Sequence, residues 1–67
     1  MTLPDLIRLA AIRVCTNREL DVLALRTAGH SLTRTAEILG ISRATVTTTQ
    51  ARAHRKIRTA LEETTDA

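Results

Sequence analysis

Three residues divide this chain into helical segments. Pro4, Gly29 and Gly40 are its only Pro and Gly residues. Pro fits the first turn of a helix, whose N–H groups lack partners anyway, and Gly ends helices because positive φ costs it little. Between these positions the apolar residues recur at helical spacing. The sequence therefore predicts an all-α fold whose helices begin and end near these residues.

Length and composition narrow the fold further. A chain of 67 residues makes one small domain and is too short for a Rossmann or TIM-barrel enzyme. Because Phe, Tyr and Trp are absent, the core must be aliphatic, and stacking of single-stranded bases is disfavoured. One cysteine makes no internal disulfide and fits a reducing, cytoplasmic setting. No apolar run is as long as a membrane span, so we expect no membrane partner.

The first segment predicts a helix from Pro4 to Val14. Leu9 and Ile12 lie outside its main apolar face, beside Asp5. They are either scattered exposed residues or a second contact surface. Residues 1–15 are therefore expected to form an additional N-terminal helix, with an oligomer contact as one interpretation. The expected inward face consists of Leu3, Leu6, Ile7, Ala10, Ala11 and Val14.

The second helix begins with a strong local signal. Thr16 and Glu19 have the spacing of a capping box, in which each side chain binds the backbone N–H of the other residue. Cys15 and Leu20 flank this box and can form the accompanying hydrophobic staple. Cys15 is thus expected to have a packing role, and Gly29 is expected to end the helix.

Two further helices follow. Ser31 caps a short helix from Leu32 to Leu39, and Ser42 caps a long helix from Arg43 to Glu62. Residues 63–67 are expected to form a frayed tail. The expected inward face of the long helix consists of Val46, Ala53, Ile57 and Leu61.

Residues 32–50 have the layout of a helix-turn-helix. Ala36 is small where the two helices press together, and Gly40 supplies a turn with positive φ. Val46 fills the angle between the helices. This arrangement lets the second helix enter a DNA major groove by its N-terminal end. Residues 16–62 are therefore expected to form a tri-helical core with a long recognition helix.

The charge pattern agrees with this interpretation. No Asp or Glu occurs from Ile38 to Leu61. Such a basic stretch is either a solvated face or a phosphate-contacting surface, and the helix-turn-helix pattern favours the second. The cationic residues of the stretch are Arg43, Arg52, Arg55, Lys56 and Arg58.

These segments resemble two families. Residues 16–25, with the sequence TNRELDVLAL, are similar to the opening of sigma factor region 4 and of the LuxR-type (GerE-like) DNA-binding domain. Residues 36–46, AEILGISRATV, are similar to the helix-turn-helix block of both families. Residues 51–61, ARAHRKIRTAL, resemble region 4 more closely. The resemblance covers roughly residues 16–61 and implies a fold that binds duplex DNA.

Three positions depart from the family patterns. Arg34 lies where an acidic residue is usual, Thr35 replaces a buried Ile or Val, and Thr47 replaces a common Lys or Arg. The chain also shows no other sigma region and no receiver or ligand-sensing domain. We therefore expect neither a complete housekeeping sigma factor nor a signal-gated LuxR regulator.

The resemblance implies base-reading positions at the start of the fourth helix. These are Arg43, Ala44, Thr47 and Thr48. Arg43 is the best candidate for a bidentate contact to guanine, and the two threonines can meet base edges, phosphates or a thymine methyl.

Phosphate contacts are expected around these positions. Arg52 and Arg55 extend toward the DNA backbone from further along the helix, whereas Thr33 and Arg34 approach it from the preceding helix. Ser42 and Thr45 either cap the helix or meet a phosphate, with capping favoured for Ser42. Lys56 and Arg58 are alternatively solvated surface residues.

The sequence therefore predicts a sequence-specific regulator of transcription that binds double-stranded DNA, with a possible homodimer. The alternative is a protein-interaction module of the region 4 type that acts through RNA polymerase or a sigma factor. His30 and His54 are not spaced as metal ligands, and no nucleophile–base pair accompanies Cys15. We expect no catalytic residues, no metal and no cofactor.

Overall fold

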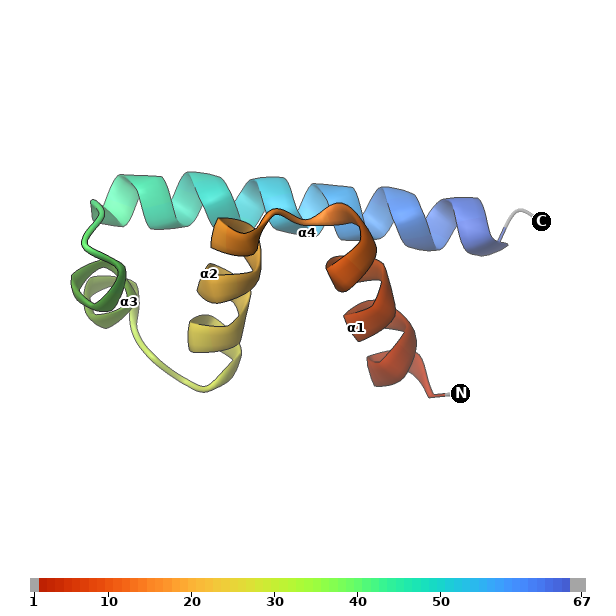
Figure 1. Cartoon of the computed structure of the whole chain (residues 1–67), viewed down its shortest axis with the longest axis horizontal. Helices are drawn as coiled ribbons and strands as arrows, with labels where there is room; N and C mark the ends of the chain where they lie inside the picture. Colours follow the sequence, from red (N-terminus) through yellow and green to blue (C-terminus); the bar gives the residue numbers. More distant parts are fainter. Residues whose placement is uncertain (1, 66–67) are drawn as a thin grey trace.

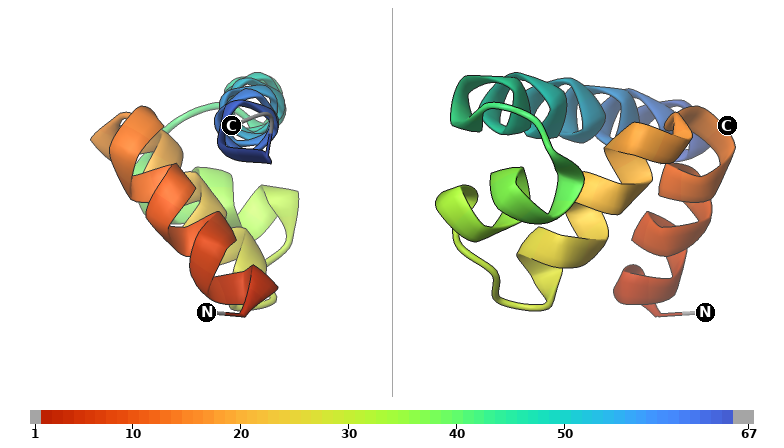
Figure 2. Two further views of the ribbon diagram at one scale, coloured as in Figure 1. Left: turned by 90° about the vertical axis from the view of Figure 1, so that its right-hand side faces the viewer. Right: turned by 60° about the vertical axis from the view of Figure 1, so that its left-hand side comes forward.

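The computed structural model describes residues 2–65, and the side chains of residues 2–63. Its helices are α1 (Leu3–Val14), α2 (Asn17–Thr27), α3 (Leu32–Leu39) and α4 (Arg43–Thr65), and the described residues form no strand. The 23-residue α4 is the axis of the molecule, with α2 and α3 below one half and α1 below the other (Figure 1). The end-on view in Figure 2 shows the three shorter helices on the same side of α4. The all-α prediction is confirmed.

Side-chain caps begin the first two helices. Thr2 caps α1, with its Oγ1 accepting the Asp5 N–H at 3.4 Å. At α2 the Glu19 N–H donates to Thr16 Oγ1 at 3.2 Å, and the Thr16 N–H donates to Glu19 Oε1 at 2.8 Å. Both halves of the capping box are therefore present, as predicted.

Glycine ends both α2 and α3. Gly29 has φ of +100° and Gly40 has φ of +68°, so both lie in the region that L side chains rarely adopt. Beyond each glycine the chain folds back onto the preceding helix. The N–H of His30 donates to the Leu25 carbonyl at 3.1 Å, and that of Ile41 to the Ala36 carbonyl at 3.0 Å. These turns set the directions in which α3 and α4 leave.

The buried apolar residues form two separate clusters. The first lies between α2, α3 and the start of α4, and the second between α1, α2 and the later turns of α4. The first cluster contains Val22, Ala36 and Val46, covered by Leu32, Leu39 and Ile41. The second contains Ala10, Ala11 and Ile57, covered by Cys15, Leu20, Leu23, Ala60 and Leu61.

The expected inward face of α1 is only partly buried. Ala10 and Ala11 are buried, but Leu3, Ile7 and Val14 are 65%, 40% and 37% exposed. Figure 1 shows the reason. The C-terminal end of α1 lies against α4, whereas its first turns lie away from α4 and have no neighbouring helix among those described. The prediction of a buried stripe along the whole helix was therefore wrong.

The long helix is confirmed and extends further than predicted. It continues to Thr65, three residues beyond the expected end at Glu62. Of the predicted tail, residues 66–67 lie outside the described residues. Thr49, which was not placed on the inward face, is only 7% exposed. Its position, three residues after Val46 and four before Ala53, is the helical spacing of that face.

Candidate nucleic-acid interface

Ser42 organises the start of α4. Its Oγ accepts the N–H of Thr45 at 3.0 Å, and the two hydroxyls lie 2.8 Å apart. This bond satisfies one of the N–H groups that a helix start leaves unpaired, so the capping role expected for Ser42 is confirmed. Both side chains remain exposed, as do Arg43 and Ala44, so the first turn of α4 faces solvent.

The helix-turn-helix framework is closed beneath this turn. Val46 and Val22 are fully buried, and Ala36 is 6% exposed. Because Val46 lies between α2 and α3, the first turns of α4 cannot shift without opening this cluster. The predicted roles of Ala36 and Val46 thus agree with the packing, and the exposed side of α4 is held on a rigid base.

The predicted base-reading residues share the exposed side of these turns. Arg43, Ala44, Thr47 and Thr48 are all exposed. The Thr47 hydroxyl donates to the Arg43 carbonyl at 3.2 Å. That bond uses the Thr47 proton and leaves its oxygen and its methyl group available to a ligand.

The residues predicted on α3 are also exposed, with one constraint. Arg34 Nη1 lies 3.3 Å from Glu37 Oε2, and both side chains are about 60% exposed (61% and 59%). An exposed ion pair of this kind contributes roughly 0–1 kcal/mol, so it holds the guanidinium only weakly. Thr33 is exposed beside it. The structure therefore places both residues where a phosphate can reach them.

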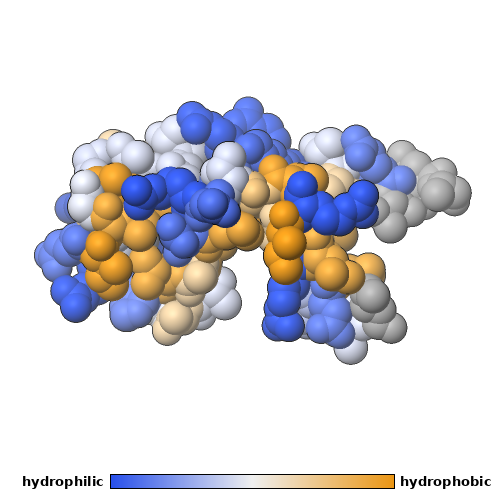
Figure 3. Space-filling view, in the orientation of Figure 1, coloured by the Kyte–Doolittle hydropathy of each residue, from blue (hydrophilic) through white to orange (hydrophobic). Residues whose placement is uncertain are grey.

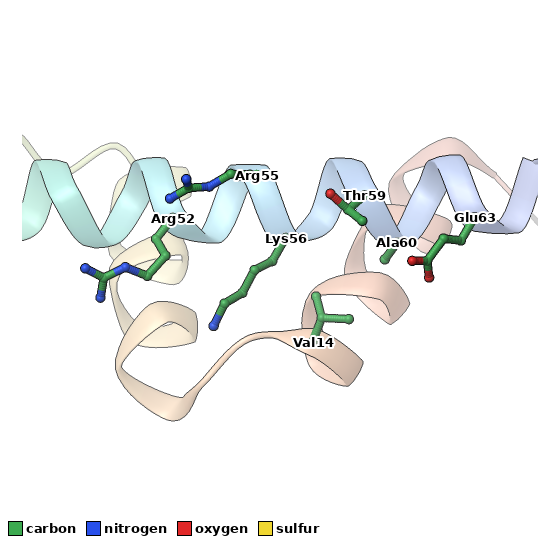
Figure 4. A pocket seen from close by; sticks show the side chains of 7 residues that line it. All are labelled: Val14, Arg52, Arg55, Lys56, Thr59, Ala60 and Glu63. Carbon is green, nitrogen blue, oxygen red and sulfur yellow. The ribbon is translucent and has the colours of Figure 1, made fainter.

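Arg52 and Arg55 border an open groove further along α4. Figure 4 shows both side chains extending from the helix, while Lys56 points toward the segment that joins α1 and α2. Both arginines are exposed. The groove is lined by Val14, Arg52, Arg55, Lys56, Thr59, Ala60 and Glu63.

Lys56 has a structural partner that the sequence did not reveal. Its Nζ lies 2.8 Å from Glu19 Oε1, and the Glu19 side chain is only 3% exposed. The interpretation of Lys56 as a solvated surface residue was therefore wrong. Since the two residues are 37 positions apart, no local pattern could have indicated the pair. The positive charge that α4 offers to a ligand comes from its arginines rather than from Lys56.

The ion pair controls the ionisation of Glu19. The hydrogen bond from Lys56 holds the pKa of the Glu19 carboxyl below its usual range, and the Thr16 N–H acts in the same direction. Burial alone would raise this pKa, but the hydrogen bonds outweigh it. Glu19 is therefore a charged link between the α2 capping box and α4.

Cys15 lies near the Glu19–Lys56 ion pair, and its thiol is not activated as a nucleophile. Burial raises the pKa of its thiol, and the negative charge of Glu19 adds to the effect. Its Sγ lies 4.0 Å from the Ala53 carbonyl, within reach of a weak S–H donor. A thiol that stays protonated is a poor nucleophile, so the geometry agrees with the expected packing role.

Arg26 is a second linking residue that the sequence analysis missed. Its Nη1 donates to the His30 carbonyl at 2.6 Å, and its Nε donates to Gln50 Oε1 at 3.3 Å. Arg26 thereby joins the end of α2, the following turn and the recognition helix. His30 is half-buried, and its carbonyl takes part in this connection.

Within residues 2–63, no three His, Cys, Asp or Glu side chains gather closely enough to hold a metal ion. None of the four helices, over the part of the chain that is described, combines the length and apolarity needed to cross a bilayer.

Comparison with known proteins agrees with the helix-turn-helix geometry. Searches of the curated proteins and of the solved structures gave no match. The model of the GerE family, described as bacterial regulatory proteins of the luxR family, matches residues 13–62, or 50 of the 67 residues. The matched range covers α2, α3 and nearly all of α4, but only the last two residues of α1. The chain therefore belongs to the luxR family of bacterial regulatory proteins, which carry a DNA-binding helix-turn-helix.

Proposed function

We propose that this protein regulates transcription by binding specific sequences of double-stranded DNA, with the start of α4 in the major groove. The observation that carries this proposal is the exposed first turns of α4 standing on the closed Val22–Ala36–Val46 cluster. A rigidly held helix end fits the major groove and presents its side chains to base edges. The proposed role is binding rather than catalysis, and the proposed location is the cytoplasm.

The base-reading role is assigned to Arg43, Ala44, Thr47 and Thr48. Arg43 presents five donors that suit the O6 and N7 acceptors of guanine. Thr47 retains an acceptor oxygen after its bond to the Arg43 carbonyl, and its methyl group suits thymine. Ala44 and Thr48 complete the exposed side of the same turns.

The phosphate-contacting role is assigned to residues on both sides of this surface. From α3 these are Thr33 and Arg34. At the start of α4, Ser42 and Thr45 combine a hydroxyl with the positive end of the helix dipole. Further along α4 these are Arg52 and Arg55. Contacts of this kind set the position of a protein on DNA, but they carry no sequence information directly.

The assignment of roles is tested by comparing Arg43→Ala with Arg52→Ala on a duplex selected from a random library and on a random duplex. Loss of a base contact should cost about 1–3 kcal/mol on the selected duplex and much less on the random one. Loss of a phosphate contact should weaken both complexes equally. Equal losses on both duplexes for Arg43→Ala would show that Arg43 does not read a base.

A salt titration tests the function itself. Binding that depends on phosphate contacts weakens linearly on a logarithmic scale as salt rises, because bound counterions are released. We expect a steep salt dependence and a measurable site preference. Absence of duplex binding at low salt would instead favour a protein-interaction module acting through RNA polymerase or a sigma factor.

The proposed regulator acts as a homodimer. One helix-turn-helix covers a short site, and a single small module gives limited affinity. Two copies related by a two-fold axis read two half-sites and roughly double the contact surface. Selection from a random library tests this directly, because the recovered sequences show whether half-sites occur in pairs.

A further inference from the structure

The exposed large apolar side chains are concentrated on one helix. Among the described residues, six such side chains are exposed, and five of them belong to α1. The sixth is Ile38 of α3, at 45% exposure. The five on α1 are Leu3 at 65%, Ile7 at 40%, Leu9 at 46%, Ile12 at 60% and Val14 at 37%.

The surroundings of α1 form a concave apolar corner. A groove runs between α1 and the C-terminal part of α4, and Arg13 and Glu63 border it. Figure 3 shows apolar surface on the part that hangs below this half of α4. The apolar lining consists of Leu6, Leu9, Ala10, Val14, Ala60 and Leu61.

The charges at the two ends of α1 indicate what covers this corner. Asp5 and Arg13 lie on either side of Leu9 along the helix and within 80° of each other around it, at 100° per residue. Both are exposed, and among the described residues the Asp5 carboxylate pairs only with the exposed Arg8, at 3.9 Å, and with the Thr2 hydroxyl, at 2.8 Å. The apolar surface thus has an acidic end and a basic end.

A second copy of this helix, running antiparallel, complements that pattern. Two-fold symmetry then places Asp5 of each copy beside the partner subunit's Arg13, so that the charge pair forms twice. Leu9 meets its counterpart between the two charge pairs, and Ile12 lies opposite the partner's Leu6. A parallel arrangement would place like charges together, which opposes it.

We propose that α1 is the homodimer seam of this protein, formed by antiparallel pairing of Leu9 and Ile12 between two copies. This inference rests on the homodimer of the proposed function and identifies its interface. Nearly all of α1 lies outside the range matched by the family, so the seam is a feature added to the common helix-turn-helix unit. A helix of 12 residues is ~18 Å long, and the seam is smaller than a standard interface of about 800 Å² per partner. We therefore expect a weak dimer, with a dissociation constant on the order of micromolar.

Sedimentation equilibrium of the whole chain, from low to high micromolar concentration, tests the seam. The chain should pass from monomer to dimer, and Leu9→Ser should raise the dissociation constant at least about tenfold. Ile38→Ser is the matched control, because Ile38 and Leu9 are 45% and 46% exposed. It should leave the dimer unchanged. A monomer at all concentrations, or equal effects of the two variants, would overturn the proposal.

Exchanging the charges tests the antiparallel direction. Asp5→Arg and Arg13→Asp should each weaken the dimer, and the double variant should restore it. Both changes oppose the dipole of α1, so a purely local effect on the helix would make the double variant the weakest. Circular dichroism at the same concentrations shows whether α1 remains helical. Antiparallel pairing would be overturned by a double variant that is folded but dimerises no more tightly than the single variants. It would also be overturned by a double variant that has lost the α1 helicity of the single variants.

Binding to a duplex with one half-site separates this inference from the function. Leu9→Ser should bind a single half-site as the unaltered chain does, because the residues assigned to DNA lie on α3 and α4. A dimer that binds no duplex leaves the seam intact and overturns the DNA-binding proposal. A chain that stays monomeric but binds the half-site overturns the seam and leaves the DNA-binding proposal intact.

Discussion

The two ends of this molecule are packed to different degrees. At the helix-turn-helix end, Val22 and Val46 are completely inaccessible to solvent. At the α1 end, Ala10, Ala11 and Ile57 each retain 8% exposure, and large apolar residues of the same helix are open to solvent. Three helices border each cluster, but α1 leads away from α4 and its own first turns have no neighbouring helix among those described (Figure 1).

The difference shows what encloses an aliphatic core when aromatic residues are absent. Val22 and Val46 are completely buried where α2, α3 and α4 approach them from three directions. A single helix laid against another leaves most of its circumference uncovered. The helix-turn-helix unit therefore presents a rigid surface, whereas α1 leaves large apolar side chains exposed to solvent.

The largest expected effect comes from placing a carboxylate in each cluster. Val46→Asp buries a charge without a partner and should unfold the whole chain. Ala10→Asp should release α1 while residues 16–62 remain folded, because α1 contributes nothing to the Val46 cluster. Helical circular dichroism measures both, with most signal lost in the first variant and a limited part in the second. Complete unfolding of both variants would mean that the two clusters form one cooperative core.

Breaking the Glu19–Lys56 ion pair should have the next largest effect. Lys56→Met leaves Glu19 buried without its cation and should lower the free energy of unfolding by about 2 kcal/mol. The Lys56 side chain is 36% exposed, and water near it limits the loss. Urea unfolding measures the change, with Arg58→Met as the control at an exposed cation of the same helix. Equal losses would remove the special role of the pair.

Acidification should weaken the same link. Glu19 has a lower pKa in the folded chain than in the unfolded chain, so the unfolded chain binds more protons. The contribution is complete above the ordinary Glu pKa of about 4.3 and is lost as pH falls through the lower folded value. Urea unfolding between neutral and acid pH should show this loss, and Glu19→Gln should reduce it. An unchanged pH dependence in Glu19→Gln would assign the loss to other carboxylates.

The smallest effect is expected at Thr35 of α3. Its side chain is fully buried, and its Oγ1 has no hydrogen-bond partner among the described residues. Thr35→Val keeps the shape and removes the unsatisfied hydroxyl, so it should raise the free energy of unfolding by about 1 kcal/mol. Thr35→Ser keeps the hydroxyl and should be destabilising. A Val variant less stable than the unaltered chain would indicate that the hydroxyl has a partner in solution.

The helices were predictable because their signals are local. The Thr16–Glu19 capping box, Gly29, Gly40 and the Ser42 cap each act within four residues, and all four lie at helix ends. The exposure of Ala44 and Thr48 followed from their place opposite Val46 on the helix. These elements determine both the fold and the place of the proposed DNA surface.

What escaped prediction depends on distant parts of the chain. Lys56 meets Glu19 across 37 positions, and Arg26 meets Gln50 across 24. The open first turns of α1 could not be foreseen either, since amphipathic spacing does not reveal whether a neighbour is long enough to cover the stripe. Long-range ion pairs and missing neighbours are properties of the assembled fold.

The continuity of α4 has a mechanical consequence. One uninterrupted helix of 23 residues, ~34 Å long, carries the proposed reading end and the half that supports α1. A continuous helix of this kind is stiff. In the proposed dimer, the angle between the two DNA-binding ends would therefore depend on how far α4 turns between its start and the part that packs against α1. Each residue inserted after Arg55 would turn one end by about 100° relative to the other. In the proposed dimer, the accepted spacing of half-sites would therefore depend on the number of residues in α4.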